Sequence, residues 1–403
     1  MNHVYAVILA GGKSSRLFPF NKVLSDLTGS GRSLIQQAYD RVSIIPEKNR
    51  YVLTVKAMVS PTRRQIKLPA SHFLTDPARR GTWPALMWAM AHLRLKDPTA
   101  VIAVVTGDHV IPKVKEFQRA FTQAVRTARA ENSIVVIPVR PSSVAQEWTS
   151  FGAVSGDGAI GRWGEGAIRI VGFEEKPTMV RARQMIHEGG WFWNAGMFFF
   201  RISVAEQALR IYQPKMSQIY EGMAEALVHG KMSVAVKMFE AFPEKIVHPL
   251  DPQRMADNSI DYAIMSPLVH STTTVASAWM TRQALTDWKD LGQWTALRQV
   301  VKPDRHGNIK IGDVRLGSDV RNSILVAEHG HRIDISAVEG LIVALAGHQA
   351  LILQESQVGR VKEWVAAAKK NQPIIGQTPQ IDSFALSKRK NIVILSNTSP
   401  EAI

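Results

Sequence analysis

An apolar run near the N-terminus leads into a short loop that holds two glycines and two basic side chains. Residues 4–9 are followed by Ala10-Gly11-Gly12, and then by Lys13 and Arg16. Because glycine has no Cβ, backbone N–H groups in such a loop can approach phosphate oxygens, whose charge Lys13 and Arg16 could neutralise. Paired glycines can also simply end a strand, so the loop by itself leaves both interpretations open.

Two familiar phosphate-binding motifs are excluded at this loop. A Walker A loop would need a glycine at the position of Val7, five residues before Gly12. The dinucleotide-binding fingerprint would need glycines at the positions of Lys13 and Arg16. The loop therefore indicates a different class of nucleotide site.

A third lysine follows close behind. Lys22 lies in the stretch Asn21-Lys22-Val23-Leu24. A lone lysine is usually a surface residue, but beside Lys13 and Arg16 it would supply another positive charge for a triphosphate. Transfer of a phosphoryl or nucleotidyl group depends mainly on positioning and charge neutralisation.

A carboxylate follows a second apolar run. Residues 101–105 are all Val, Ile or Ala, and they lead into Thr106-Gly107-Asp108-His109. An aspartate at the carboxyl end of a buried strand can hold Mg²⁺ against phosphates. The alternative is that Asp108 caps the following turn, and we favour the metal role.

The elements that must position these residues alternate between two types. Short Val- and Ile-rich runs, typical of strands buried on both faces, alternate with longer amphipathic segments. This rhythm predicts an α/β fold with a doubly wound, mostly parallel sheet, with ligands at the carboxyl ends of the strands. Expected strands lie at 4–9, 51–55, 101–105 and 133–139, and expected helices at 33–42, 83–93 and 115–130.

The pattern changes after Pro303. Short apolar stretches interrupted by Gly, Asn or Asp predict a small β-rich unit. Residues 357–370 then place Val358, Val361, Trp364 and Val365 on one helical face, which predicts a closing amphipathic helix that packs on the β unit.

Taken in order, the motifs resemble those of the nucleotide-sugar pyrophosphorylases over roughly residues 4–370. They are Leu9-Ala10-Gly11-Gly12 with Arg16-Leu17 and Pro19, Lys22, Gly107-Asp108-His109, Phe173-Glu174-Glu175-Lys176-Pro177, Trp193-Asn194-Ala195-Gly196-Met197-Phe198, Ser259-Ile260-Asp261-Tyr262 and Trp288-Lys289-Asp290-Leu291-Gly292-Gln293-Trp294. The resemblance implies a nucleotidyltransferase domain at 1–300, a unit similar to a short left-handed β-helix with its closing helix at 301–371, and a tail of unassigned role at 372–403.

The resemblance also implies roles for individual residues. Arg16, Lys22 and Asp108 would be catalytic, and Asp108 and Asp290 would be ligands of Mg²⁺. Substrate-binding positions would be Leu9, Ala10, Gly11, Gly12, Gly107, Gly152, Glu175, Lys176, Asn194 and Gly196. The chemistry fits, since Lys176 offers a charge to a phosphate, Glu175 can accept hydrogen bonds from sugar hydroxyls and Asn194 can both donate and accept.

Ordinary structural roles stand beside these assignments. Glu175 and Lys176 could form a surface ion pair, and the aromatic residues around Asn194 are more often core than ligand stack. Asp261 could cap a helix that begins at Tyr262 or line the sugar site, and we favour the cap. Asp290 could merely make a turn, so its role as a metal ligand is less secure than that of Asp108.

Several positions depart from the family pattern. Ser14 stands where a glycine is expected in the loop, and Ser15 follows it. Gly81 and Trp83 replace other residues in a segment that we associate with base or sugar preference. Ser266 stands where a glutamate is expected, and nothing in the sequence explains it.

Composition limits the class of protein. With 403 residues, 45% hydrophobic and 21% charged, the chain can bury a large core, and without cysteine it has no disulfide or thiolate chemistry. No apolar run approaches the roughly 20 residues of a membrane span, so a cytoplasmic enzyme without a membrane anchor is expected. The net charge of +15 favours anionic ligands. Because Lys and Arg are scattered and their densest cluster, Lys388-Arg389-Lys390, lies in the tail, nucleic acid is a minority interpretation.

The expected reaction joins a sugar-1-phosphate to a nucleotide and releases pyrophosphate by in-line attack at the α-phosphorus, without a covalent enzyme intermediate. The resemblance favours GTP and mannose-1-phosphate as substrates. Alternatives are another nucleotide and sugar pair, or a non-catalytic sensor of nucleotide sugars. By analogy, the β-rich unit could mediate a homodimer. No sugar isomerase domain is expected, and His329 and His331 are interpreted as parts of a turn.

Overall fold

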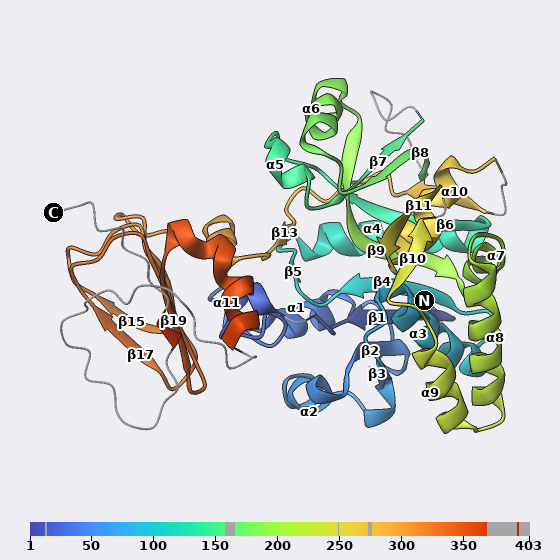
Figure 1. Cartoon of the computed structure of the whole chain (residues 1–403), viewed down its shortest axis with the longest axis horizontal. Helices are drawn as coiled ribbons and strands as arrows, with labels where there is room; N and C mark the ends of the chain where they lie inside the picture. Colours follow the sequence, from blue (N-terminus) through green and yellow to red (C-terminus); the bar gives the residue numbers. More distant parts are fainter. Residues whose placement is uncertain (13, 158–165, 249, 273–275, 369–392, 395–403) are drawn as a thin grey trace. The chain divides into compact units, whose positions relative to one another are not determined.

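The computed structural model describes residues 1–12, 14–157, 166–248, 250–272, 276–368 and 393–394 (Figure 1). The predictions for Lys13 and for the cluster Lys388-Arg389-Lys390 fall outside these residues. The chain forms two compact units. The first comprises Met1–Gly11, Ala38–Gly107 and Ile111–Trp288, and the second comprises Gly12–Gln37, Asp108–Val110 and Lys289–Ile403.

The first unit is built on a nine-stranded sheet in the order β3-β2-β1-β4-β9-β6-β12-β8-β7. Seven strands run in one direction, and β8 and β9 run against them. The predicted mostly parallel sheet is therefore confirmed. The strands are β1 (Val4–Leu9), β2 (Arg50–Val55), β3 (Phe73–Asp76), β4 (Val101–Thr106), β6 (Ser133–Val139), β7 (Gly152–Gly156), β8 (Ile168–Glu175), β9 (Trp191–Arg201) and β12 (Ser277–Met280).

Strand β9 shows how the sheet is covered on both faces. Successive side chains of a strand point to opposite faces. Phe198 and Phe200 join a core cluster with α3 (Thr82–Lys96), α7 (Ile202–Tyr212) and α8 (Pro214–Val228). Phe199 instead meets Phe121 of α4 (Val114–Ala130), with ring centroids 5.0 Å apart. Because apolar side chains alternate across both faces, β9 needs helices on each side, as a doubly wound fold supplies.

The remaining elements of the first unit lie around this sheet. Figure 1 shows α7, α8 and α9 side by side, and α8 also packs against α3. Strands β10 (Lys245–His248) and β11 (Asp251–Asp257) form a hairpin. The residues of α1 (Leu34–Arg41) are divided between the two units. The other helices of the first unit are α2 (Lys56–Gln65), α5 (Ala145–Trp148), α6 (Met179–Glu188), α9 (Met232–Glu240) and α10 (Ser266–His270).

The second unit contains the predicted β-rich region. Short strands stack in parallel, as in a β-helix: β14 (Ile309–Ile311), β16 (Ile324–Ala327) and β18 (Leu341–Ala346) form one ladder, and β15 (Asp313–Leu316) and β17 (Arg332–Ile335) form another. Strand β19 (Gln349–Gln354) pairs antiparallel with β18 and parallel with β20 (Val393–Ile394). A further antiparallel pair joins β5 (His109–Val110) to β13 (Lys289–Asp290).

The closing helix packs as the sequence predicts. Helix α11 (Val361–Ala368) follows a 3₁₀ turn at Glu355–Arg360, so it begins a turn later than expected. Val361, Trp364 and Val365 are buried in one core cluster with residues of β14, β16, β18 and β19. The second unit also takes in residues 12–37, which the expected boundary at residue 300 assigns to the first domain.

Candidate active site

The end of β1 is fixed by its neighbours in the sheet. The N–H of Ala10 donates to the carbonyl of Leu53 at 2.9 Å, and the hydroxyl of Thr54 donates to the carbonyl of Ala10 at 2.8 Å. On the other side, the N–H of Gly107 donates to the carbonyl of Leu9 at 2.9 Å. The carboxyl ends of β1 and β4 therefore lie next to each other, which is where an α/β sheet places its ligands.

The two glycines that follow Ala10 leave open space beside the backbone. A Cβ added at Gly11 would meet only Val55, at 4.0 Å, and one added at Gly12 would meet nothing within 4 Å. Packing against the protein therefore does not explain these glycines. Open space next to exposed N–H groups is what a bound phosphate requires.

Ser14 keeps the backbone shape that glycine would favour. Its φ of 49° lies in the left-handed region, and it precedes a 3₁₀ turn at Ser15–Leu17. This conformation costs a non-glycine residue roughly 1 kcal/mol. The Ser14 hydroxyl oxygen accepts a hydrogen bond of 3.1 Å from the N–H of Lys22. The departure from the family pattern therefore preserves the loop conformation and ties the loop to Lys22, while the Arg16 side chain is exposed on the turn.

Lys22 is buried between two carboxylates. Its Nζ donates to Oδ2 of Asp108 at 2.9 Å and forms a second ion pair with Asp290. The side chain of Lys22 is 9% exposed, whereas those of Asp108 and Asp290 are 36% and 27% exposed. Pairing of β5 with β13 sets His109 opposite Asp290, which brings the sequence-distant Asp108 and Asp290 to one place. The structure thus brings together Lys22, expected to bind the triphosphate, and Asp108 and Asp290, expected to bind the metal ion.

Electrostatics favours the charged forms of these groups. Burial lowers the pKa of Lys22, but the charges of Asp108 and Asp290 outweigh it, so the net change is a raised pKa. Burial raises the pKa of Asp108, but His109 and Lys22 outweigh it and lower the pKa below its usual range. The lysine is therefore an ammonium and Asp108 a carboxylate at neutral pH.

The same residues suit a divalent cation. Ligand atoms of Asp108, His109 and Asp290 all lie within 4.8 Å of one another. Carboxylate oxygens are the ligands that Mg²⁺ prefers. The ammonium of Lys22 balances only one of the two carboxylate charges, so the group keeps a net negative charge that a cation could offset.

A second polar site lies in the first unit, where β7 meets β8 and β9. Gly152 is paired with Glu175 on one side and with Asn194 on the other. A Cβ at Gly152 would lie 2.5 Å from Oε2 of Glu175 and 3.4 Å from Cβ of Asn194. A larger residue at this position would displace the carboxylate of Glu175. The structure brings together Gly152, Glu175 and Asn194, the three residues to which the resemblance gives binding roles. Gly196 completes the group, since its N–H donates to Oδ1 of Asn194 at 3.2 Å.

Glu175 also lines a pocket of about 410 Å³. Its lining consists of Gly81, Thr82, Glu175, Lys176, Glu244, Asp257, Asn258, Ser259 and Asp261. Lys176 is half exposed, so its ammonium can reach a phosphate, and its Nζ lies 3.6 Å from Oε1 of Glu175. Glu175 is only 11% exposed and is therefore not part of an ordinary surface pair.

The cap favoured for Asp261 is wrong. Asp261 is the first residue of a π-helical turn, Asp261–Met265, and the residue before that turn, Ile260, makes no side-chain capping hydrogen bond. The carboxylate of Asp261 accepts instead from Nδ2 of Asn194 at 2.8 Å and lines the pocket with Glu175. The competing interpretation, that Asp261 lines the sugar site, fits its place in the wall of this pocket.

Two carboxyl groups in this pocket hold protons more tightly than usual. Burial raises the pKa of Glu175 to about 8, and the nearby charge of Asp261 adds to the effect. Burial also raises the pKa of Asp261. A protonated carboxyl can donate a hydrogen bond and an ionised one can accept, so the pair offers both functions to sugar hydroxyls.

Two of the unusual positions have a structural explanation. Gly81 has a φ of 113°, and a Cβ there would lie 2.2 Å from the carbonyl oxygen of Asn258. Trp83 is fully buried, and its backbone N–H donates to the same carbonyl at 3.2 Å. Gly81 lets two segments approach closely at the pocket wall. Ser266 is buried at the start of α10, and nothing in the structure explains the replacement of the expected glutamate.

The sequence does not indicate some residues of the two sites. His109 stands out only as part of the motif Gly107-Asp108-His109. Asp257, in β11, and Glu244, just before β10, belong to no motif. His331 lies in a turn as expected, with Nε2 2.7 Å from the carbonyl oxygen of Gly347. Within the described residues, none of the helices is both long and apolar enough to cross a lipid bilayer.

Comparison with known proteins agrees with this arrangement. The alginate biosynthesis protein AlgA of Pseudomonas putida is 29% identical over 372 residues, covering 89% of this chain and 70% of that protein. The mannose-1-phosphate guanylyltransferase of Escherichia coli is 26% identical over 386 residues, covering 91% of this chain and 73% of that protein. A crystal structure from Thermus thermophilus, described as a mannose-1-phosphate geranyltransferase, has the same fold, with a TM-score of 0.72 at 22% identity over 91% of this chain and 99% of that one.

The family model for nucleotidyl transferases matches residues 5–306, which is most of the chain and includes the loop after β1, the acidic pair and the pocket around Glu175. The chain therefore belongs to the nucleotidyl transferase family.

Proposed function

We propose that this nucleotidyltransferase forms GDP-mannose and pyrophosphate from GTP and mannose-1-phosphate, with Mg²⁺ held by Asp108 and Asp290. The observation that carries the proposal is the buried ammonium of Lys22 between these two carboxylates. A triphosphate and its metal ion need both signs of charge at one place, and this group supplies both.

The choice of substrates rests on the relatives. The Escherichia coli protein is named for the transfer of a guanylyl group to mannose-1-phosphate, and it matches 91% of this chain. The family match, at residues 5–306, covers the segments that contain the acidic pair and the pocket around Glu175. The proposed partners are therefore GTP and a sugar phosphate.

Glu175, Asn194 and Asp261 would bind the sugar and Lys176 its phosphate. Glu175, Lys176 and Asp261 line a pocket of about 410 Å³, Asn194 donates to the carboxylate of Asp261, and Gly152 leaves room beside Glu175. A sugar presents hydroxyl groups that both donate and accept, which a mixture of carboxyl and amide groups can match. Lys176 lies at the exposed side of Glu175, where a phosphate attached to the sugar could meet it.

The proposed step is an in-line displacement. A non-bridging oxygen of mannose-1-phosphate forms a bond to the α-phosphorus of GTP, and the bond from that phosphorus to the β-phosphate oxygen breaks. Pyrophosphate leaves with the electron pair, and no proton transfer is needed because the nucleophile is already an anion. Mg²⁺, when bound, would offset charge on the triphosphate oxygens.

The chain's own residues would align two mutually repelling anions. Lys22 would neutralise the triphosphate next to Asp108, and the N–H groups of Gly11 and Gly12 would contact its oxygens. Arg16, which is exposed on the turn after this loop, would add charge at the leaving pyrophosphate. Orientation and charge stabilisation of this kind account for most of the rate in such reactions.

The substitution Asp108→Ala tests the proposal. We expect it to lower Mg²⁺-dependent pyrophosphate release at least about a hundredfold, as loss of a group that stabilises transition-state charge does in other enzymes. Asp313→Ala, which removes a half-exposed carboxylate paired with Arg332, is the matched control and should leave turnover unchanged. An Asp108→Ala enzyme that retains full activity would disprove the assignment of Asp108.

A further inference from the structure

Helix α4 presents a basic face to the outside of the first unit. Its buried side consists of Phe117, Ala120, Phe121, Ala124, Val125 and Ala128, which pack on the sheet. On the opposite side, Lys115, Arg119 and Arg126 are exposed. Residues four and eleven positions apart lie close to one line along a helix, so these three cations form a row.

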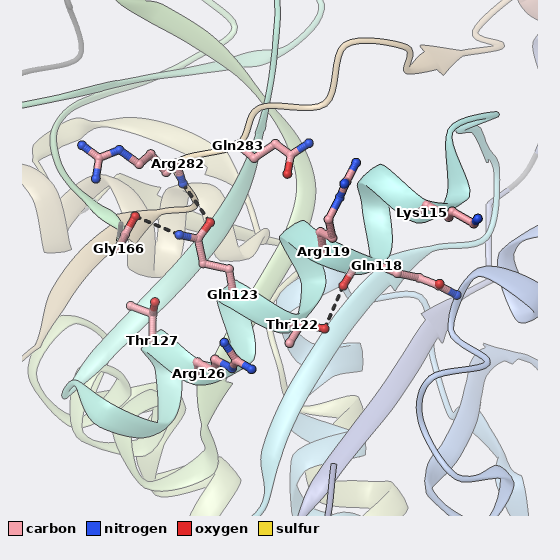
Figure 2. Close-up of a pocket in the computed structure, with 10 residues that line it drawn as sticks. All are labelled: Lys115, Gln118, Arg119, Thr122, Gln123, Arg126, Thr127, Gly166, Arg282 and Gln283. Carbon is pink, nitrogen blue, oxygen red and sulfur yellow. Dashed lines mark hydrogen bonds between the residues drawn. The ribbon is translucent and has the colours of Figure 1, made fainter. Parts of the chain in front are cut away.

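The row forms one wall of a pocket of about 1240 Å³. The other wall contains Arg282 and Gln283, which follow strand β12. Figure 2 shows the ten residues that line it: Lys115, Gln118, Arg119, Thr122, Gln123, Arg126, Thr127, Gly166, Arg282 and Gln283. Every side chain in this set is cationic or able to donate a hydrogen bond, and none is acidic or aromatic.

A side chain of α4 ties the two walls together. Oε1 of Gln123 accepts from the N–H of Arg282 at 3.1 Å, and Nε2 of Gln123 donates to the carbonyl of Gly166 at 2.8 Å. The pocket therefore has a defined shape on three chain segments. It is not just an exposed helix surface.

The positive charges of the row are not paired with a carboxylate of α4. Glu116 is the single acidic residue of the helix, and its carboxylate accepts hydrogen bonds from the N–H and hydroxyl of Thr286, on another segment. In the described part of the chain, no carboxylate forms an ion pair with Lys115, Arg119 or Arg126. Like charges four residues apart, such as those of Lys115 and Arg119, destabilise a helix. A bound anion would remove this repulsion.

We propose that this pocket binds a small polyanion that carries several phosphate groups. Lys115 and Arg126 are separated by eleven positions, or about 16 Å along a helix. A single phosphate cannot contact cations over that span, whereas several linked phosphates can. Arginine side chains suit phosphate oxygens, because a guanidinium donates hydrogen bonds and accepts none, and the hydroxyl of Thr127 can donate as well. The hydroxyl of Thr122 already donates to the carbonyl of Gln118 at 2.8 Å.

A small polyanion fits better than a nucleic acid. Proteins that bind single strands combine basic grooves with aromatic side chains on which bases stack, and among the described residues none that lines this pocket is aromatic. Arg282 adds a cation on the segment that follows β12. The site shares no residue with Lys22, Asp108 and Asp290 or with the pocket around Glu175, so it does not depend on the proposed reaction.

Calorimetry with inorganic tripolyphosphate, in buffer without Mg²⁺, tests the proposal on the full chain. Because the catalytic site can also take this anion, we expect two binding events per chain. The double substitution Arg119→Gln and Arg126→Gln should weaken one of them at least about tenfold and leave the other, since each arginine offers charge-assisted hydrogen bonds. Inorganic monophosphate should bind the same pocket at least about tenfold more weakly than tripolyphosphate.

The matched control removes the same charge from another exposed helix face. Arg63→Gln with Arg64→Gln on α2 also lowers the net charge by two and should leave both binding events intact. The proposal is overturned if Arg119→Gln with Arg126→Gln changes neither event, or if the α2 variant weakens them equally. It is also overturned if a single-stranded oligonucleotide displaces tripolyphosphate from this pocket and binds it more tightly. All four positions are exposed, so each variant should unfold at the same temperature as the natural chain.

Discussion

The ammonium of Lys22 lies 2.9 Å from Oδ2 of Asp108, although 86 positions separate the two residues in the sequence. The short pair of strands β5 and β13 adds Asp290 to the same ammonium. Lys22 therefore serves the acidic pair in two ways. It balances part of the carboxylate charge, and it places a cation where a triphosphate would bind.

Replacing Lys22 by Met should destabilise the chain when no divalent cation is present. The substitution leaves two partly buried carboxylates next to each other without a counter-charge. We expect the free energy of unfolding to fall by about 1–2 kcal/mol, a figure lowered to allow for the partial exposure of the carboxylates. Added Mg²⁺ should restore much of the loss, because the cation offsets the same charges. Thermal unfolding with and without Mg²⁺ measures both effects.

Lys176→Met is the matched control for that prediction. This lysine also lies beside a carboxylate, but it is half exposed and far from the acidic pair in sequence. Its loss should change the unfolding temperature less, and Mg²⁺ should not compensate for it. Equal destabilisation of the two variants, or no response of the Lys22 variant to Mg²⁺, would contradict the account of the acidic pair.

Asp261→Asn should raise KM for the sugar phosphate. The amide can still accept from Asn194, but it can no longer offer an ionised oxygen to a sugar hydroxyl, so we expect about a tenfold increase. The KM for the nucleotide should stay within about twofold, because Asp261 belongs to the pocket around Glu175. Steady-state kinetics with each substrate varied in turn measures the difference.

Glu174→Gln controls for a general effect on this part of the sheet. Glu174 is adjacent to Glu175 in β8, but its carboxylate pairs with Arg181 and does not line the pocket. If Glu174→Gln raises KM for the sugar phosphate as much as Asp261→Asn does, Asp261 has no special part in binding the sugar.

Glu175 should make stability depend on pH. Its pKa is raised from an ordinary value of 4.5 to about 8, so the folded chain binds this proton more tightly than the unfolded chain does. The contribution to stability is fully present below pH 4.5 and is lost as the pH rises through about 8. The free energy of unfolding should therefore fall over this range through this group.

Glu175→Gln isolates that contribution. The amide does not ionise, so the variant should lose less stability than the natural chain between about pH 5.5 and about pH 8.5, values chosen on either side of the raised pKa of about 8. Urea unfolding at both pH values gives the comparison. If the natural chain and the variant lose equal stability, Glu175 is ionised in the folded protein and cannot donate a proton to a sugar oxygen.

Much of the fold could be predicted because the apolar runs are unambiguous. The Val- and Ile-rich segments that became β1, β4 and β6 are buried along nearly their whole length, which is what a doubly wound sheet requires. The closing helix followed from the spacing of Val361, Trp364 and Val365. What periodicity could not show is that β9 runs against its neighbours, because a strand buried on both faces looks the same in either direction.

A site residue could be predicted where the neighbouring residues in the sequence form a recognisable pattern. Asp108 follows directly from a buried strand, and the resemblance supplied Asp290. Asp261 was misjudged because an aspartate before an apolar segment usually caps a helix. Here the segment starts as a π turn, whose side-chain directions no sequence pattern indicated. Asp257 and Glu244 reach the pocket only through tertiary contacts, which no local pattern in the sequence indicates.

The most direct test of the proposed function measures pyrophosphate release from a matrix of nucleoside triphosphates and sugar-1-phosphates, with Mg²⁺ present or chelated. We expect the fastest release with GTP and mannose-1-phosphate, and none when Mg²⁺ is removed. A preference for another pair would keep the mechanism and correct the substrates. If the folded protein releases no pyrophosphate with any substrate pair but binds a nucleotide sugar, the proposed reaction is contradicted and the protein is a sensor.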